Sequence, residues 1–454
     1  MKADSLNALE KLAPLFDGQV ILPRDRRYID AIKVWNRAIR KTPAAVVRCA
    51  GKDDIIRAIE VAHRAQLPIS VRAGGHGYAG HAVCDGGLVI DLSLMKRVAV
   101  DPEKRIVAVE AGVLAGELDD HTEPFGLATP LGSCRDVGVA GYALGGGEGS
   151  LTPGFGYGCD NLVRAQIVLA DGRMVTASEE SNPELFWAIR GAGANFGIVT
   201  TMEFKLHPAN LVLSGHLQYS LHDAVRVLRL VSSFAPQIPH DLSLMLSLLR
   251  RAGEVVLDVG IVWPGDGKAG QRVLEPLLAV VKPVRNTIAV RNYFDEQRAG
   301  SSEPGGLASR RRGGHFENLT KEIIDMMLDH ALRSPGEGSG ITLIYWHGPW
   351  CSGPGDNAFG FRRAGYEYWV HAYWQEAIDN RVSVEWVDNF FAATQPFSTG
   401  AVYVNDLEEE GESRVRAAYG PNYERLKQIK QQFDPDNFFR SNQNVVPAPE
   451  KANR

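Results

Sequence analysis

Two glycine-rich loops hold the residues of this sequence that are best suited to chemistry. The first, residues 71–80, has four glycines within seven residues and carries His76 among them. The second, residues 132–149, is also rich in glycine and has Cys134 near its start. Glycine lets a backbone approach a ligand closely, and such loops can point several N–H groups at one anion, as a pyrophosphate requires. The loops therefore predict a phosphate-containing ligand in contact with His76.

Other motifs that would indicate chemistry are missing or weak. There is no HExxH, GxSxG or GxxxxGK[ST], so a zinc peptidase, an α/β-hydrolase and a P-loop protein are not indicated. A GxGxxG occurs at 265–270, but residues 276–294 contain no Asp or Glu to bind a ribose, which favours a plain strand–turn–helix. His76 and His81 lie five residues apart across glycines, a poor spacing for a helical metal site, so no metal is expected.

The bulk composition bounds the class of protein. The chain has 454 residues, 44% of them hydrophobic, and a formal net charge of −5, which offers no electrostatic footprint for nucleic acid. No apolar run is long enough to span a membrane, and residues 1–23 lack the apolar core of a secretory signal. The five cysteines are odd in number and form no CxxC pair, which indicates a reducing compartment. We therefore expect a cytoplasmic protein whose oligomeric state the sequence does not indicate.

The first half of the chain has an α+β pattern with glycine-rich joints. A helix is predicted over 53–66, where Pro68 follows, and a second over 184–190, between Asn182-Pro183 and Gly191. Alternating and β-branched runs predict strands at 69–71, 88–92, 105–110, 163–169, 173–176 and 198–206, with a hairpin turn at Asp171-Gly172.

The pattern changes near Leu211, where longer strands alternate with helices predicted at 223–235, 270–280 and 321–332. Three arginines, Arg310 to Arg312, fall in a stretch, 299–315, that is interpreted as a solvated loop, with a role in steering anions as the alternative. A last helix is predicted over 423–433. These changes divide the chain into residues 1–207, 208–398 and 399–454, with the third part returning to the first.

The two glycine-rich loops resemble the flavin-binding loops of the berberine-bridge-enzyme-like oxidoreductases of the vanillyl-alcohol-oxidase superfamily. His76 stands in an R-x-G-G-H run, and Cys134 lies four residues before the glycine of a V-G-x-x-G run, as in that family. The resemblance covers about residues 40–207 and 400–447. Its further motifs lie at 157–162, 170–172, 185–197, 403–405, 419–426, 433–440 and 442–444.

The resemblance implies an α+β fold in which a two-subdomain FAD-binding domain of the p-cresol-methylhydroxylase (PCMH) type is joined to a substrate domain. That second domain is an antiparallel β-sheet covered by helices. FAD would be bonded covalently to His76 through the flavin 8α-methyl, and also to Cys134 through C6. Further cofactor contacts are predicted at Arg72, Ala73, Gly74, Gly75, Gly77, Tyr78, Gly80, His81, Gly132, Ser133, Val137, Gly138, Gly141, Tyr142, Gly145, Ile198, Tyr403, Asn405 and Asn442.

The implied chemistry is hydride transfer from a substrate C–H to flavin N5. An alcohol substrate also needs a base for its O–H proton. Many relatives use the second tyrosine of a Y-x-N-Y run, but this chain has Asp406 at that position, with Tyr403 as the fallback. An unperturbed Asp has a pKa of about 3.9, and burial would raise it toward a useful value. The alternative is that Asp406 points away and only begins the acidic run 408–410.

The substrate itself is not identified by the sequence. Tyr78 matches a family position beside the substrate, and His347, Tyr373 and Trp374 are further candidates for substrate contacts. Val137, three residues after Cys134, matches a family position at which a small residue accompanies reoxidation by O2. The resemblance thus predicts an oxidase of a small alcohol, such as a sugar or a secondary metabolite. An amine oxidase and a non-catalytic flavin-binding protein are the alternatives.

Overall fold

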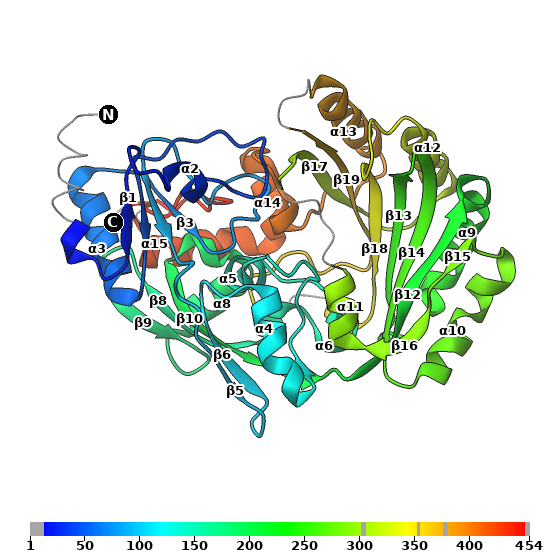
Figure 1. Ribbon diagram of the computed structural model, residues 1–454, viewed down its shortest axis with the longest axis horizontal. Coiled ribbons are helices and arrows are strands. Elements are labelled where there is room, and N and C mark those ends of the chain that lie inside the picture. The colour runs from blue at the N-terminus through cyan, green and yellow to red at the C-terminus, as the bar shows by residue number, and fades with distance from the viewer. Residues whose placement is uncertain (1–12, 301–305, 352–354, 376–379, 450–454) are drawn as a thin grey trace.

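The computed structural model describes residues 13–300, 306–351, 355–375 and 380–449. Two lobes lie side by side (Figure 1). The first contains the N-terminal half together with the C-terminal segment, and the second contains the large sheet that begins at β12. The predicted domain limits at 207 and 398 stay predictions, although β12 starts close to the first of them.

The first lobe contains a small, mainly parallel sheet of order β1-β2-β4-β3. Its strands are β1 (Gln19–Ile21), β2 (Ala45–Arg48), β4 (Leu88–Asp91) and β3 (Ile69–Arg72). Helix α3 (Lys52–Ala65) buries Ile55, Ala58, Ile59 and Ala62 in the lobe's core. The sequence predicted a helix at 53–66 and strands at 69–71 and 88–92. Helix α3 and strands β3 and β4 confirm them to within a residue or two. The first glycine-rich loop leaves the sheet at the end of β3.

A second sheet in the same lobe is antiparallel, with the order β5-β6-β10-β8-β9. Its strands are β5 (Val98–Asp101), β6 (Ile106–Glu110), β8 (Leu162–Val168), β9 (Met174–Ala177) and β10 (Ile198–Lys205). The predicted hairpin turn is confirmed, with Gly172 at φ +81°. Helix α8 (Pro183–Ala192) has proline in its first turn, and Arg190 and Gly191 leave the helical conformation near its end. Helices α4 (Ala115–Thr122) and α5 (Val139–Leu144) adjoin the second glycine-rich loop.

The second lobe is built on an eight-stranded sheet of order β15-β12-β14-β13-β18-β19-β17, with β16 beside β12, and all its pairs are antiparallel. The strands are β12 (Leu211–Ser220), β13 (Ser243–Arg251), β14 (Glu254–Pro264), β15 (Arg285–Asn286), β16 (Ala289–Asn292), β17 (Ala308–Phe316), β18 (Gly340–Trp346) and β19 (Gly365–Trp374).

Helices α9 (Leu221–Phe234), α10 (Gly267–Val280), α12 (Lys321–Leu332) and α13 (Arg381–Thr394) cover one face of this sheet (Figure 1). Side chains alternate between the two faces of a strand, so the apolar residues of β12, β13 and β14 pack under the helices while polar ones face the first lobe. The predicted helices 223–235, 270–280 and 321–332 are confirmed as α9, α10 and α12. Because β14 ends at Pro264 and α10 begins at Gly267 with Asp266 as its N-cap, the GxGxxG is a strand–turn–helix.

The arginine run is not a solvated loop, which corrects the sequence interpretation. Part of the predicted loop, residues 301–305, lies outside the described residues, but Arg310 to Arg312 lie in strand β17. Arg311 pairs with Asp406, Arg310 with Glu408 and Arg312 with Glu410, at 2.6, 2.5 and 2.9 Å. The basic run is therefore neutralised by the acidic run of the C-terminal segment, and the pairs fix one lobe against the other.

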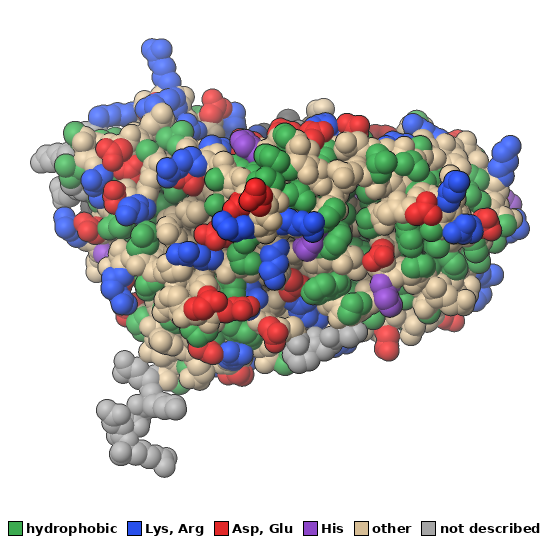
Figure 2. All heavy atoms as spheres, turned by 90° about the horizontal axis from the view of Figure 1, so that it is seen from below, with side chains coloured by type: hydrophobic (Ala, Val, Ile, Leu, Met, Phe, Trp, Pro, Cys, Tyr) green, Lys and Arg blue, Asp and Glu red, His purple; other side chains and the backbone are tan. Residues whose placement is uncertain are grey.

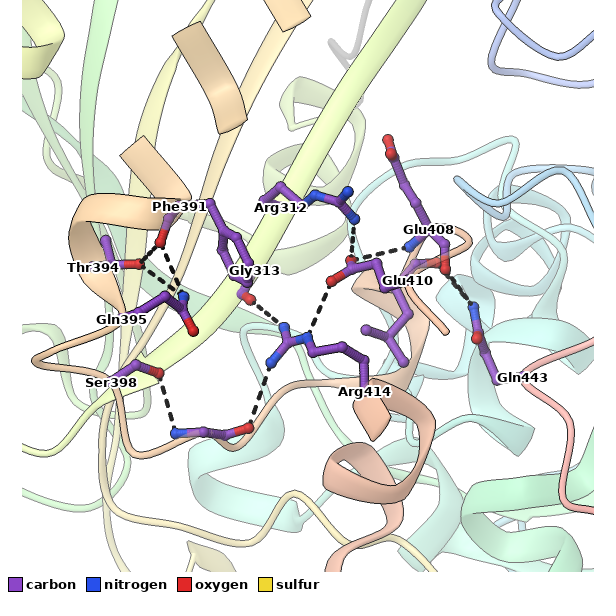
Figure 3. A network of polar contacts seen from close by, with 12 residues as sticks. Arg312, Gly313, Phe391, Thr394, Gln395, Ser398, Glu408, Glu410, Arg414 and Gln443 are labelled. Carbon is purple, nitrogen blue, oxygen red and sulfur yellow. Dashed lines mark hydrogen bonds and ion pairs between the residues drawn. The ribbon is translucent and has the colours of Figure 1, made fainter. Parts of the chain in front are cut away.

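The C-terminal segment returns to the first lobe through η6 (Val404–Asp406), α14 (Glu412–Tyr419) and α15 (Tyr423–Phe433). Lys430 of α15 is fully buried, where its Nζ pairs with Asp434 at 2.6 Å and donates to the Asn195 carbonyl. Figure 3 shows how the segment also holds β17: Arg414 donates to the Gly313 carbonyl and pairs with Glu410. This arrangement presents Tyr403 and Asp406 to the space between the lobes.

The surface shows no charge pattern that would suggest a polyanion partner on the face in Figure 2, where basic and acidic side chains are interspersed. Among the described residues, no helix has the length and apolarity needed to cross a bilayer. None of the five cysteines, all of them within the described part of the chain, forms a disulfide. A cytoplasmic location stays a prediction.

Candidate active site

A cavity of about 1020 Å³ lies where the two lobes meet. Its wall combines the two glycine-rich loops, part of the C-terminal segment and the polar face of the large sheet. Most small-molecule sites are roughly 300–1,000 Å³, so this cavity can hold a large cofactor and a substrate together. It brings together residues that are several hundred positions apart in the sequence.

The two glycine-rich loops touch each other at positions where no side chain fits. A Cβ on Gly74 would lie 2.3 Å from the Gly138 nitrogen, and one on Gly138 would lie 2.4 Å from the Gly74 nitrogen. A Cβ on Gly145 would lie 2.1 Å from Asn405 Oδ1. These glycines are therefore required by close backbone approach, and the loops present bare backbone to the cavity.

His76 and Cys134 both line this cavity. His76 Nε2 lies 3.1 Å from Asp136 Oδ2, and the imidazole stacks against Trp35 with ring centroids 5.7 Å apart. Burial lowers the pKa of His76 below its ordinary value, against the opposing charge of Asp136. At neutral pH the imidazole is thus uncharged and has a nitrogen lone pair.

Tyr403 and Asn405 hold the second glycine-rich loop from the C-terminal side. The Tyr403 hydroxyl accepts from the Gly147 N–H at 2.9 Å and from Asn405 Nδ2 at 2.7 Å, and Asn405 Nδ2 also donates to the Tyr142 carbonyl. Burial raises the pKa of Tyr403 well above its ordinary value. Tyr403 is therefore a neutral phenol at neutral pH and acts as a fixed support of the loop.

Asp406 and Arg311 form a buried ion pair in the cavity wall. Arg311 Nη2 lies 2.6 Å from Asp406 Oδ1, and its Nη1 donates to the Tyr78 hydroxyl at 2.8 Å. The guanidinium also lies over the rings of Tyr78 and Trp369, 4.6 and 4.3 Å from their centroids. Burial raises the pKa of Asp406, while the charge of Arg311 opposes that rise.

The second oxygen of Asp406, Oδ2, is buried and receives no hydrogen bond from the described residues. Gly313 leaves room beside it, since a Cβ there would lie 3.2 Å away. Asp406 therefore lines the cavity with one oxygen paired to Arg311 and with a second, buried oxygen that has no hydrogen-bond donor among the described residues. The alternative that Asp406 points away from the site does not match this geometry.

Two known protein families match this sequence. Residues 43–178 match the FAD binding domain family, and residues 402–446 match the family described as berberine and berberine like. An FAD-linked oxidoreductase of Dictyostelium discoideum is 31% identical over 421 residues, which cover 91% of each chain. The chain belongs to the berberine-bridge-like FAD-linked oxidoreductases.

A further relative and a solved structure are similar to this chain over nearly its whole length. The (R)-6-hydroxynicotine oxidase of Paenarthrobacter nicotinovorans is 29% identical, over 95% of this chain and 97% of the relative. The crystal structure of 6-hydroxy-D-nicotine oxidase from Arthrobacter nicotinovorans superposes with a TM-score of 0.89 at 27% identity, covering 95% of this chain and 98% of the other. The predicted fold class and family are thereby confirmed.

The cavity fits the FAD that this family binds. Its glycine cradle offers backbone where a Cβ would collide, as a pyrophosphate needs. Two buried cavity-lining atoms, His81 Nε2 and Asn442 Oδ1, have no hydrogen-bond partner among the described residues, so a polar ligand can satisfy them.

Most of the residues that the sequence suggested lie in the wall of this one cavity. They are Ala73, Gly74, Gly75, His76, Gly77, Tyr78, His81, Gly132, Ser133, Cys134, Val137, Gly138, Gly141, Tyr142, Gly145, Ile198, Tyr373, Tyr403, Asn405, Asp406 and Asn442. Their individual roles stay predictions.

Four suggested residues are not in the cavity wall, and the local structure explains why. Arg72 alternates with Val71 and Ala73 at the end of β3 and instead donates to the Ala31 carbonyl. Gly80 packs against Ile39. His347 lies behind the wall, where its Nε2 contacts the Leu242 carbonyl, and Trp374 lies on the other face of β19 from Tyr373. None of the four is retained as a ligand contact.

Sequence reasoning missed several residues of the wall, above all Arg311, Trp369, His371 and Glu148. Arg311 was not recognised because its basic run has no partner nearby in the sequence. The acidic run 406–410 was the signal that could have indicated its partner. Trp369 and His371 share the cavity face of β19 with Tyr373, so the period of two would have grouped them. Glu148 is the one charged residue among the last glycines of the second loop.

Proposed function

We propose that this chain is an oxidase that removes a hydride from an alcohol carbon, with O2 as the final electron acceptor and H2O2 as the second product. Bound FAD would supply the hydride acceptor and the route of electrons to O2. The observation that carries the proposal is the carboxylate of Asp406 in the cavity wall, held by Arg311 through Oδ1 and with no hydrogen-bond donor on Oδ2 among the described residues. Such a group is what an alcohol needs to lose its O–H proton.

Arg311 sets the protonation of this base. A buried carboxyl with no cation beside it would be protonated at neutral pH and could not accept a proton. The ion pair stabilises the carboxylate, while burial keeps its proton affinity above that of an exposed aspartate. Because Tyr403 is a neutral phenol whose hydroxyl already accepts two hydrogen bonds, Asp406 is the better proton acceptor of the two.

The histidine loop supports a covalent attachment of the flavin at His76, with Cys134 as a second attachment point. An uncharged imidazole is the nucleophilic form, and Asp136 can accept the Nε2–H at 3.1 Å, which leaves Nδ1 with its lone pair. Cys134 lines the same cavity from the second loop. The bonds themselves are part of the proposal.

The sheet face of the cavity favours a substrate with several hydrogen-bonding groups. One row of cross-strand neighbours runs over the sheet from Trp369 through Thr342, Ser247 and Asp258 to Gln218. At about 4.8 Å per strand, this row spans roughly 19 Å. All five residues line the cavity, so an extended hydroxylated molecule, a sugar or a hydroxylated secondary metabolite, matches its length and polarity.

An amine substrate is the second candidate. One relative is named for 6-hydroxynicotine, a molecule that contains a basic amine. Two acidic residues of the cavity wall, Glu148 and Asp406, are groups of the kind that bind an ammonium ion. A neutral amine can lose hydride without a separate base, so this candidate predicts that Asp406 is dispensable.

The test compares two matched acid-to-amide variants, Asp406→Asn and Glu410→Gln. Both acids belong to the run that pairs with β17, but Glu410 does not line the cavity. A substrate is first found by screening alcohols and amines for peroxide release. Anaerobic flavin reduction should then slow by roughly 10²–10⁴ in D406N, the usual cost of losing a general base, and stay near the wild-type rate in E410Q. Near-normal reduction of D406N would refute the role of Asp406 and favour an amine.

A further inference from the structure

Two buried glutamates from distant parts of the chain lie near each other beside the cavity. Glu148 follows α5 in the second glycine-rich loop, and Glu367 lies on β19. Their exposed fractions are 7% and 1%, and Glu148 lines the cavity with Glu367 behind it. The two side chains lie close enough for a hydrogen bond to form between their carboxyl groups when one of them carries a proton. Tyr403 fixes this contact, because its hydroxyl binds the N–H of Gly147 next to Glu148.

Only one buried oxygen of the glutamate pair receives a hydrogen bond from a described N–H or O–H group. Trp346 Nε1 donates to Glu367 Oε2 at 2.6 Å. Glu367 Oε1 and Glu148 Oε2 receive no N–H or O–H donor from the described residues. Two ionised carboxylates are acceptors only and cannot bond to each other, so a hydrogen bond between them requires a proton.

The charges that face the pair increase its affinity for protons. Asp406 of η6 is negative, and Arg311 of β17, the cation that acts on both glutamates, is committed to Asp406 at 2.6 Å. Tyr157 and Tyr403, which also face the pair, are neutral because burial raises the pKa of each well above its ordinary value. Burial and the neighbouring negative charges likewise raise the pKa of Glu148 well above its ordinary value and that of Glu367 to about 7.

We propose that Glu148 and Glu367 share one proton in the resting enzyme and store the second proton that substrate oxidation releases. The inference rests on the proposed function for its second step only. The substrate C–H leaves as hydride with two electrons, its O–H bond breaks, and the proton passes by way of Asp406 to the Glu367 carboxylate. The pair then holds two protons. Reduction of O2 to H2O2 consumes two electrons and two protons, one carried by the hydride and one returned by the pair.

The energetic reason is the different cost of protonating the two sites. A proton that stayed on Asp406 would leave Arg311, which is 7% exposed, as a buried cation without its partner. A proton on Glu367 instead removes a buried negative charge and breaks no ion pair. The store therefore returns Asp406 to its ionised form before the next substrate arrives.

The shared proton can be tested on the oxidised holoenzyme without any substrate, by infrared spectroscopy of the protonated-carboxyl band at about pH 8, above the ordinary range of carboxyl pKa values. Wild type should show the band, and Glu148→Gln should lose it. Asp119→Asn is the matched control, since Asp119 is another buried acid with a raised pKa that does not line the cavity. A wild type without the band, or an E148Q spectrum that retains it, overturns the shared proton.

A milder variant keeps the test decisive if the glutamine variant does not fold. Trp346→Phe leaves both carboxyls but removes the donor to the Glu367 carboxylate. The pH at which the infrared band titrates should then rise by about one unit, the value of one hydrogen bond to a charged group. An unchanged titration in W346F overturns the inference.

The storage step is tested separately, by reducing the enzyme anaerobically with an alcohol substrate in the presence of a pH-indicator dye. Wild type should retain the released proton, and Glu367→Gln should release about one proton per flavin, because it has no carboxylate at that position. Equal release from both proteins overturns the store. If no alcohol reduces the flavin, the proposed function and the storage step fall together, while the infrared band still decides whether the proton is shared.

Discussion

Asp119 offers a direct test of the contact between the lobes. This residue of α4 is 7% exposed and is hydrogen-bonded to Gln297 of α11, the helix at Tyr293–Ala299. Burial raises the pKa of Asp119 from 3.8 to about 7, although Arg135 and the Gln297 side chain oppose the rise. The folded protein therefore binds this proton more tightly than the unfolded chain does.

The sign and size of the effect follow from proton linkage. Because the folded-state pKa is raised, the stabilising effect of this proton is complete below about pH 4 and is lost as the pH rises to about 7. A rise of about 3 units at 1.36 kcal/mol per unit corresponds to about 4 kcal/mol. Asp119→Asn has no carboxyl to ionise, so it should gain most of this free energy of unfolding over wild type above about pH 7 and little below about pH 4.

The assay is the free energy of unfolding of the holoenzyme by urea, measured across this pH range for wild type, D119N and Asp120→Asn. Asp120 is the control because its side chain is 50% exposed and pairs with Arg135 at 2.7 Å. Other buried acids change the free energy of unfolding of wild type and of D119N by the same amount at each pH. The difference between the two proteins therefore reports Asp119 alone. Parallel curves for wild type and D119N would refute the reasoning, as would an equal effect of D120N.

Three further predictions concern the flavin. Denatured wild type should stay yellow and carry the mass of FAD, and Cys134→Ala should keep the flavin through His76; acid precipitation that releases all flavin from wild type would contradict this. Asp136→Asn, which weakens the 3.1 Å contact to His76 Nε2, should lower the fraction of covalently bound flavin measured after denaturation, and an unchanged fraction would show that Asp136 does not orient the imidazole. Val137 lines the cavity, and Val137→Leu should slow reoxidation of the reduced flavin in aerated buffer, because one added methylene can fill a small void in a close-packed wall; slow reoxidation of wild type itself would argue against an oxidase.

Local patterns in the sequence were sufficient for many elements of the fold. The helix at α3 and the hairpin of β8 and β9 depend on residues close together in the chain, so periodicity and turn residues predicted them. For the second lobe, local patterns indicated only alternating strands and helices, whereas the antiparallel sheet covered by helices was implied by the family resemblance and is confirmed. Its order places β17 beside β19, and this pairing depends on contacts that no local pattern encodes.

The candidate site likewise contains residues that the sequence predicted and residues that it misplaced. The glycine-rich loops were predictable because close backbone approach at Gly74 and Gly138 excludes any side chain, and that requirement is visible as glycine in the sequence. Arg72 and His347 were misplaced because a residue's position in a motif or domain does not tell which way its side chain points. The strand direction and the packing around each residue decided that.

By itself, then, the sequence determined the type of ligand loop, the residues His76 and Cys134 that face it, and most of the secondary structure. Only the tertiary structure decided how the charged residues are arranged in and behind the cavity wall. Arg311 and Asp406 are distant in the chain, as are Glu148 and Glu367, and of these four residues the sequence had singled out only Asp406 as a site residue. Their protonation depends on burial and on which charges lie within a few ångströms, and both are properties of the folded chain alone.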